Sequence, residues 1–180
     1  MANEVTIVPA CLKDASYVTG NMRERDRVEA MCQLPDGTRT HELAYFLIMN
    51  GEGYVAKLNG IPVMLFGVTP MTVCAFSVWA LGTKDTWRVV SAVTKFMIPF
   101  LWEKHKAGFV TMEARSEVSH KQAHRWLRDT GAVAIGKPFV YGKNREKFLL
   151  FRWDADVLPQ IAKRYKVPLE RTRSSLPYSS

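Results

Sequence analysis

One continuous stretch, residues 73–108, limits the possible fold more than any other part of the chain. It begins with a β-branched and aromatic run at residues 73–81, a composition that favours a strand. A short polar turn follows at residues 82–85, and helical periodicity then runs over residues 86–106. A strand that leads through a tight turn into a helix N-terminus can present backbone N–H groups to an anion. The stretch therefore predicts an α/β fold with a candidate anion-binding turn.

Length, composition and charge narrow the class of protein. The chain has 180 residues, of which 47% are hydrophobic, so it is long enough for one domain with a full core. Its 25 lysine and arginine residues against 17 acidic residues give a net charge of +8, which is compatible with weak, non-specific contact with DNA. The three cysteines form no C-x-x-C pair, and His120 and His124 have no evident third ligand partner, so we expect no disulfide framework and no metal site.

Residues 58–83 carry no charge, which is enough length to span a bilayer. Pro62, Gly67 and Pro70 divide this segment into pieces of strand length, and Asn59-Gly60 is a strong hairpin signal. The N-terminus also lacks the basic and then apolar pattern of a secretion signal. We therefore expect a buried β-hairpin, no transmembrane segment and no signal peptide.

The other elements follow from hydrophobic periodicity. Strands are predicted at residues 5–9, 54–58, 61–68, 73–81, 109–114, 133–140 and 147–153, with a turn at 69–72. Helices are predicted at residues 13–31, 41–50 with Thr40 as N-cap, 86–106 with a bend or restart at Pro99, 116–129 and 157–165. The charged run at residues 23–27 is interpreted as a solvated helix face rather than a binding patch.

This order resembles the GNAT fold of the acetyl-CoA-dependent N-acetyltransferases over residues 5–153. The hairpin at Asn59-Gly60, the strand, turn and helix of residues 75–87, and the helix end at residues 125–132 fall where that family has them. The resemblance implies an α/β (α+β) fold with a mixed, mostly antiparallel sheet of about six to seven strands and about four helices. It also implies a GNAT-like domain at residues 1–153, followed at 154–180 by an extension with a short helix and a polar tail.

Over residues 54–153 the sequence is also similar to the GNAT-like internal virion protein A family of T7-like podoviruses. The residues that carry this likeness are Trp126-Leu127-Arg128 and Gly131-Ala132-Val133. This second resemblance implies a bacteriophage protein found in the host cytoplasm or in the virion, with a virion or host protein as its partner.

The GNAT resemblance also implies where acetyl-CoA would bind. The matching positions are Val78, Trp79, Ala80, Gly82, Thr83, Lys84, Asp85, Thr86 and Arg88. The family normally cradles the cofactor pyrophosphate in a glycine-rich turn, but this turn has no glycine after Gly82 and contains a carboxylate, Asp85. Lys84 and Arg88 could still pair with phosphate, while an ordinary capped helix start explains the same residues.

The candidate catalytic residues are Glu113 and His120. Glu113 could serve as a general base, although a single strand carboxylate is more often solvated or salt-bridged. Many family members place a proton-donating tyrosine at the position of Leu127, which has no proton to give.

Two functions remain open. One is a virion-associated or assembly protein with a degenerate acetyl-CoA site and no cofactor. The other is an active N-acetyltransferase that uses acetyl-CoA to modify a host protein or a small amine.

Overall fold

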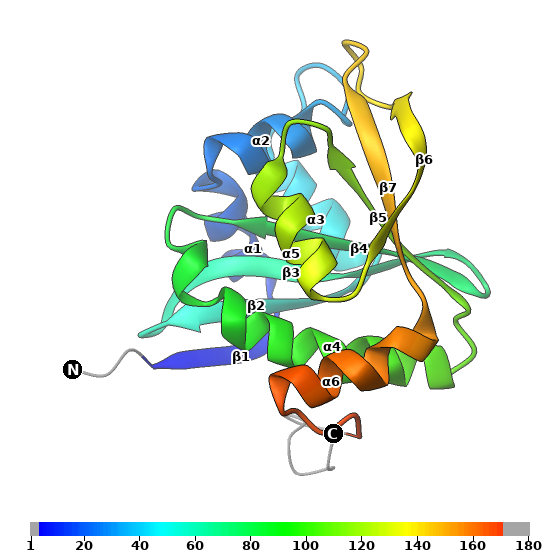
Figure 1. Ribbon diagram of the computed structural model, residues 1–180. Helices are drawn as coiled ribbons and strands as arrows, with labels where there is room; N and C mark the ends of the chain where they lie inside the picture. The colour runs from blue at the N-terminus through cyan, green and yellow to red at the C-terminus, as the bar shows by residue number, and fades with distance from the viewer. Residues whose placement is uncertain (1–3, 171–180) are drawn as a thin grey trace.

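The computed structural model describes residues 4–170 and contains one seven-stranded sheet (Figure 1). The strand order is β1-β2-β3-β4-β5-β7-β6, and only the β4–β5 pair is parallel. The strands are β1 Val5–Pro9, β2 Glu52–Leu58, β3 Ile61–Thr72, β4 Ala75–Gly82, β5 Thr111–Glu117, β6 Val133–Val140 and β7 Lys147–Trp153. The helices are α1 Leu12–Gly20, α2 Glu24–Met31, α3 Thr40–Met49, α4 Val90–Lys106, α5 Lys121–Asp129 and α6 Leu158–Tyr165. The predicted fold class is confirmed, with six helices instead of about four.

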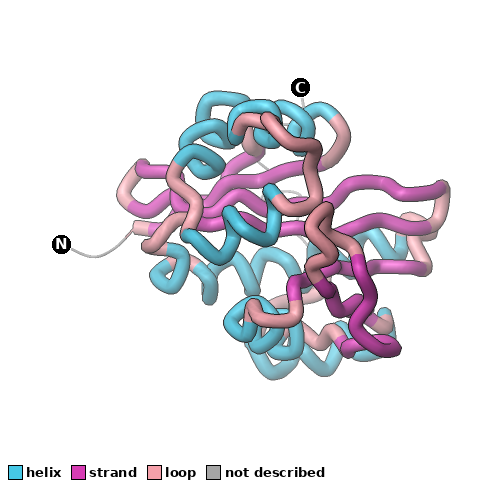
Figure 2. The backbone as a smooth tube through the Cα atoms, turned by 90° about the horizontal axis from the view of Figure 1, so that it is seen from above, coloured by secondary structure: helices cyan, strands magenta, loops and turns pink. Residues whose placement is uncertain are grey.

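Helices cover both faces of the sheet, as the two views show (Figures 1 and 2). On one face, α1 and α3 pack against Val55, Leu65 and Leu81. On the other face, α4 packs with Leu127 of α5 against Phe66 and neighbouring strand residues. Successive strand side chains point to opposite faces, which explains why the central strands are apolar almost throughout.

The hairpin between β2 and β3 is confirmed at Asn59-Gly60. Both residues adopt positive φ angles, 50° and 81°. A two-residue turn with positive φ at both positions matches the twist of the flanking strands, and asparagine and glycine tolerate that conformation best. The charge-free segment is therefore strand and turn. Among the described residues, no helix is both long and apolar enough to cross a membrane.

The single helix predicted at residues 13–31 is wrong, because the chain forms α1 and α2 instead. Asn21 ends α1, where its backbone N–H and its Nδ2 both donate to the carbonyl of Tyr17, at 3.1 and 2.8 Å. Arg23 then takes an extended backbone, with ψ of 148°, before α2 begins. The interpretation of residues 23–27 as a solvated face is also wrong in part, since Asp26 is only 3% exposed.

Several boundaries shift along the chain. Strand β3 continues through the predicted turn to Thr72, and its register with β4 shifts between Pro70 and Thr72, where proline cannot donate to the ladder. Strand β5 ends at Glu117, so α5 begins five residues later than expected, at Lys121. A 3₁₀ turn, Thr86–Arg88, precedes α4, and α4 runs through Pro99 without a restart.

The chain after β7 packs onto the rest of the molecule. The predicted helix at residues 157–165 is confirmed as α6, and its Ile161 and Ala162 are buried with Ile98 of α4. Leu158 is fully buried in the main core, so the first part of the predicted extension shares that core. Residues 171–180, which include most of the predicted polar tail, lie outside the described residues.

Candidate functional site

Strands β4 and β5 separate partway along their length. They pair only from Ala75 opposite Thr111 to Ser77 opposite Glu113, although both strands continue beyond this point. The N–H and C=O of Gly82 point away from β3, toward α2. Because backbone direction alternates along a strand, the polar backbone groups of Val78 and Ala80 point the same way as those of Gly82. The separated strands thus leave part of the β4 edge without a strand partner.

A cavity of about 560 Å³ occupies the region where the strands separate. Its walls come from β4 and β5, from α2 and α3, and from α5. Apolar side chains such as Phe46, Trp79 and Leu127 form much of the lining. Phe46 is 51% exposed at this cavity. A concave, mostly apolar site with a few polar groups is the usual form of a binding pocket.

The turn after β4 uses its backbone N–H groups within the protein. Thr83 donates to the carbonyl of Val63 at 2.9 Å, and Thr86 donates to that of Thr83 at 3.1 Å. Arg88 and Val89 close the 3₁₀ turn in the same way, at 2.9 and 3.1 Å. A helix N-terminus binds anions through N–H groups that lack internal partners. These four amides of the turn therefore already have acceptors within the protein.

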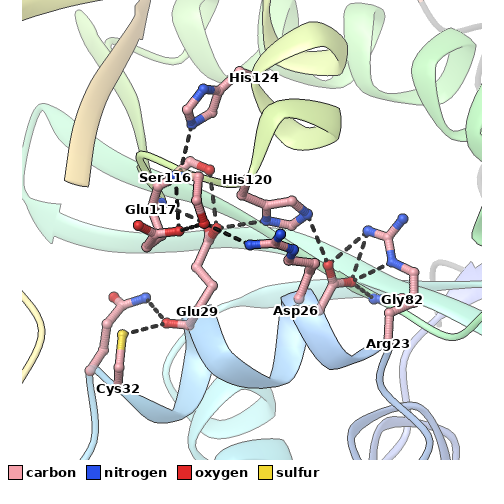
Figure 3. A network of polar contacts seen from close by, with 12 residues as sticks. Arg23, Asp26, Glu29, Cys32, Gly82, Ser116, Glu117, His120 and His124 are labelled. Atoms are coloured by element: carbon pink, nitrogen blue, oxygen red, sulfur yellow. Dashed lines mark hydrogen bonds and ion pairs between the residues drawn. The ribbon is translucent and has the colours of Figure 1, made fainter. Parts of the chain in front are cut away.

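A buried carboxylate holds the first amide of the turn. The N–H of Gly82 donates to Asp26 Oδ2 at 2.6 Å, and the carbonyl of Gly82 accepts from the N–H of Arg23 at 2.8 Å (Figure 3). Arg23 also forms an ion pair with Asp26, at 2.7 Å between Nη2 and Oδ1. The protein's own helix α2 thus occupies both backbone groups at the end of β4.

The nine predicted cofactor residues do not all reach the cavity. Val78, Trp79, Ala80 and Thr86 line it. Gly82 and Thr83 are buried beside it, whereas Lys84 and Arg88 are exposed. Arg88 lies 3.8 Å from the carboxylate of Asp85. The side chains predicted to hold phosphate are thus on the surface, next to a negative charge.

The two predicted catalytic residues occupy different environments. Glu113 is 6% exposed and ion-paired to Arg115 at 2.6 Å and to Arg152 at 3.5 Å, so the salt-bridged alternative is the one observed. His120 lines the cavity at the N-cap of α5 and is 5% exposed. The structure does not bring these two residues together in one site.

The imidazole of His120 lies between two carboxylates of α2 (Figure 3). Its Nδ1 is 2.7 Å from Glu29 Oε2, and its Nε2 is 3.4 Å from Asp26 Oδ1. Glu29 Oε2 also accepts from the Ser116 hydroxyl at 3.1 Å and from the Glu117 amide at 3.2 Å. Helix α2 is therefore fastened to both separated strands, to β4 through Asp26 and to β5 through Glu29.

Sequence reasoning missed Asp26 and Glu29. They are three residues apart, so they share one face of α2, and Ala30 is buried on the same side. The signal in the sequence that could have pointed to them is a pair of carboxylates at this spacing in a helix with almost no apolar face. Only the fold shows that this face meets His120, which lies more than 90 residues away in the chain.

The thiol of Cys32, one turn after Glu29, is expected to react with iodoacetamide far more slowly than the thiols of Cys11 and Cys74. Burial, with the nearby carboxylates of Glu146 and Glu29, raises the pKa of its thiol to about 11 from the usual 9.0. At pH 8 its thiolate fraction should be about a hundredfold below that of an unperturbed thiol. Iodoacetamide labelling followed by peptide mass spectrometry should show Cys11 and Cys74, both exposed, modified first. All three should react equally in urea, and equal rates in the folded protein would contradict this prediction.

His124 is expected to make the protein less stable in mild acid. Its ring is 2% exposed beside Phe151, and burial lowers the pKa of its imidazole below the usual 6.5. The unfolded chain therefore binds a proton near pH 6.5 that the folded chain takes up only at lower pH, so stability falls as pH drops below 6.5. Urea unfolding at pH 7 and pH 5 should show that the free energy of unfolding falls less between these pH values in His124→Gln than in wild type. The same change at exposed His41 should leave the loss as it is in wild type.

No protein-family model matches the sequence, and no curated protein matches it. Solved structures do match. YncA, a putative acetyltransferase from Salmonella typhimurium with its cofactor acetyl-CoA, is 13% identical with a TM-score of 0.64, over 84% of this chain and 94% of that one. An acetyltransferase of the GNAT family from Streptococcus pneumoniae is 16% identical with a TM-score of 0.59, over 83% of this chain and 98% of that one. The ribosomal-protein-S18-alanine N-acetyltransferase from Escherichia coli is 13% identical with a TM-score of 0.60, over 97% of this chain and 100% of that one.

These likenesses establish that the protein has the GNAT fold, as its sequence predicts. Identities this low establish the fold and not the activity, because one fold serves many functions. The resemblance to the internal virion protein A family stays a prediction from the sequence.

Proposed function

We propose that this protein is a non-catalytic member of the GNAT fold whose acetyl-CoA site is degenerate, and that it acts as an interaction or assembly protein. One observation carries the proposal, namely that amides in the turn after β4 already donate to acceptors within the protein. The amides of Gly82, Thr83 and Thr86 all have internal acceptors. The virion-associated part of the proposal is supported by this observation together with the sequence resemblance to the internal virion protein A family.

Electrostatics supports the same conclusion. A pyrophosphate at this turn would approach Asp26, which is buried and accepts the Gly82 amide at 2.6 Å. Like charges in a partly buried site repel more strongly than in water, because the effective dielectric constant is lower. Arg23 neutralises part of the Asp26 charge through their ion pair, and Lys84 and Arg88 add positive charge only from the exposed side of the turn.

The groups that would transfer protons are also poorly suited to the reaction. Leu127, at the position of the family's tyrosine, is an apolar residue of the core. Glu113 is held by two arginines, with one oxygen 2.6 Å from Arg115 and the other 3.5 Å from Arg152, so both of its oxygens already have partners within the protein.

Titration of the full chain with acetyl-CoA tests the proposal. We expect no heat of binding and no change in thermal unfolding at millimolar acetyl-CoA, whereas a ligand at a hundredfold its Kd adds about 2.7 kcal/mol. Tight binding that disappears in a Lys84→Ala, Arg88→Ala double variant would overturn the proposal. Mass spectrometry of purified phage particles tests the virion role separately, and absence of the protein from them would reject that role.

An active N-acetyltransferase is the second candidate function. The observation that favours it is His120, which lies in the cavity with Nδ1 held by Glu29, next to the unpartnered β4 edge. The acceptor would be a host protein or a small amine. Transfer of a labelled acetyl group to an amine, lost in His120→Gln, would support this function, and an absence of transfer would reject it. Weak contact with DNA stays a prediction from the net charge.

A further inference from the structure

The charged residues of the helices are divided unequally between the two faces of the sheet. Helices α4, α5 and α6 together carry eight basic and two acidic residues. Helices α1, α2 and α3, which belong to the opposite face, carry three basic and five acidic residues. The excess positive charge of the protein is therefore gathered on the helices of one face rather than spread evenly around it.

Six of the basic side chains belong to one surface that α4, α5 and α6 share. Trp126 Nε1 of α5 donates to Thr94 Oγ1 at 2.8 Å, which places α5 beside the part of α4 that carries Lys95. At the end of α5, Arg164 of α6 donates to the carbonyl of Asp129, and α6 also packs against α4 (Figure 1). The exposed side chains that define this basic surface are Lys95, Lys121, Arg125, Arg128, Lys163 and Arg164.

The six side chains of the basic surface retain their positive charge for a partner. Within residues 4–170, none of them forms an ion pair with a carboxylate. Lys121 and Arg164 donate to backbone carbonyls, which are neutral. By contrast, the two lysines near the end of α4 pair with Glu52 and Glu170. An anionic partner would thus meet uncompensated charge on the basic surface.

We propose that the basic surface binds the phosphate backbone of double-stranded nucleic acid without reading its sequence. The inference rests on the interaction role proposed above and names the class of partner. Lys121, Arg125 and Arg128 are four and three residues apart, so they form a row roughly 10 Å long on one side of α5. A duplex presents one phosphate per about 3.4 Å along each strand, so this row has the length of about three phosphates.

The lack of exposed apolar side chains favours nucleic acid over a protein or a membrane. Every exposed large apolar side chain among residues 4–170 lies outside α4, α5 and α6. The centre of a protein interface is depleted of charge, and helices that bind membranes insert apolar side chains. Interfaces with nucleic acid are more polar and much more positively charged.

The same surface suits a duplex better than a single strand. Proteins bind single strands largely by stacking the bases on aromatic side chains. The aromatic side chains of α4, α5 and α6 are buried or half-buried, whereas the basic side chains are exposed. Contacts with the backbone of a duplex need only the charges.

The first test measures how salt weakens the binding of the full chain to a fluorescein-labelled DNA duplex, by anisotropy. About four to six phosphate contacts should give a slope between about −3.6 and −5.4 when the logarithm of the association constant is plotted against that of salt concentration. Two duplexes of unlike sequence should bind equally. A slope shallower than about −2, or no binding at about 50 mM salt, would overturn the proposal.

Two triple variants of equal charge test the place of binding. One removes half of the basic surface: Lys95→Gln, Arg125→Gln and Arg128→Gln. The control removes three exposed charges elsewhere: Lys13→Gln, Arg27→Gln and Lys137→Gln. The first variant should make the salt slope shallower by about 2.7, and the control should keep the wild-type slope. Equal losses in both would show that net charge alone is responsible and would overturn the surface.

Amide chemical shifts of the wild type locate the contact without a variant. The duplex should shift amides in α4, α5 and α6, and shifts confined to α1, α2 and α3 would overturn the proposal. An RNA duplex of the same length should bind within about tenfold of DNA, because both present phosphates. A single strand of equal length, and vesicles containing phosphatidylserine at equal phosphate concentration, should bind more weakly. Equal or tighter binding of either would overturn the choice of a duplex.

Acetyl-CoA added to the same samples separates the two proposals. Binding of acetyl-CoA together with a steep salt slope for the duplex would overturn the non-catalytic role alone. A flat salt response without any binding of acetyl-CoA would overturn the nucleic-acid surface alone.

Discussion

Replacing Asp26 with alanine is expected to lower the free energy of unfolding by about 2–4 kcal/mol. The carboxylate is 3% exposed, accepts the Gly82 amide at 2.6 Å and pairs with Arg23. Its removal leaves a buried N–H without an acceptor and a guanidinium without its partner. The side chain of Arg23 is 28% exposed, so water screens part of the lost ion pair, and the expected loss is smaller than for a fully buried pair. Urea unfolding followed by circular dichroism measures the change.

Asp26→Asn is the matched control, because its amide oxygen can still accept the Gly82 N–H. We expect it to cost about 1–2 kcal/mol, less than alanine. Arg25→Ala, on the exposed side of the same helix, should change the free energy of unfolding by under about 1 kcal/mol. Equal stability of wild type and Asp26→Ala would show that α2 does not depend on this carboxylate.

Replacing Gly67 with alanine is expected to lower the free energy of unfolding by about 3 kcal/mol or more. A Cβ atom there would lie 2.2 Å from the carbonyl oxygen of Glu52 and 2.9 Å from the Cα of Gly53. It would also lie 2.9 Å from the ring of Trp79, which lines the cavity. Because two of these three atoms are backbone, the β2–β3 pairing itself would have to shift. Thermal and urea unfolding should both show the loss.

Gly53, the cross-strand partner of Gly67, provides the control. A Cβ atom there would lie 3.3 Å from the Trp79 ring and 3.5 Å from Ile48 Cδ1, both side-chain atoms. We expect Gly53→Ala to change the free energy of unfolding by under about 1 kcal/mol, since the clash is small and alanine restricts the unfolded chain. Equal losses in the two variants would contradict the steric explanation.

Local signals predicted most of the architecture. Asn59-Gly60 fixed the central hairpin because few residue pairs adopt two successive positive φ angles. The strand at residues 133–140 and the strand at 147–153 were predicted with their observed bounds, because both are rich in β-branched or aromatic residues. Helix ends were predicted less well, since α1 and α2 share one charged, helix-favouring sequence and are separated only by the turn at Asn21.

The sequence by itself predicted the order of strands and helices, and it showed that the candidate phosphate turn has no glycine after Gly82. Both observations depend only on residues that are close together in the chain. Only the tertiary structure decided how that turn is used. Asp26 is 56 residues from Gly82, and Glu29 is 91 residues from His120, and no local pattern relates such distant positions. Their contacts arise where β4 and β5 separate and α2 lies across the gap. The first residue of the turn after β4 is therefore bound by α2, a helix whose charged run at residues 23–27 the sequence predicts to face solvent.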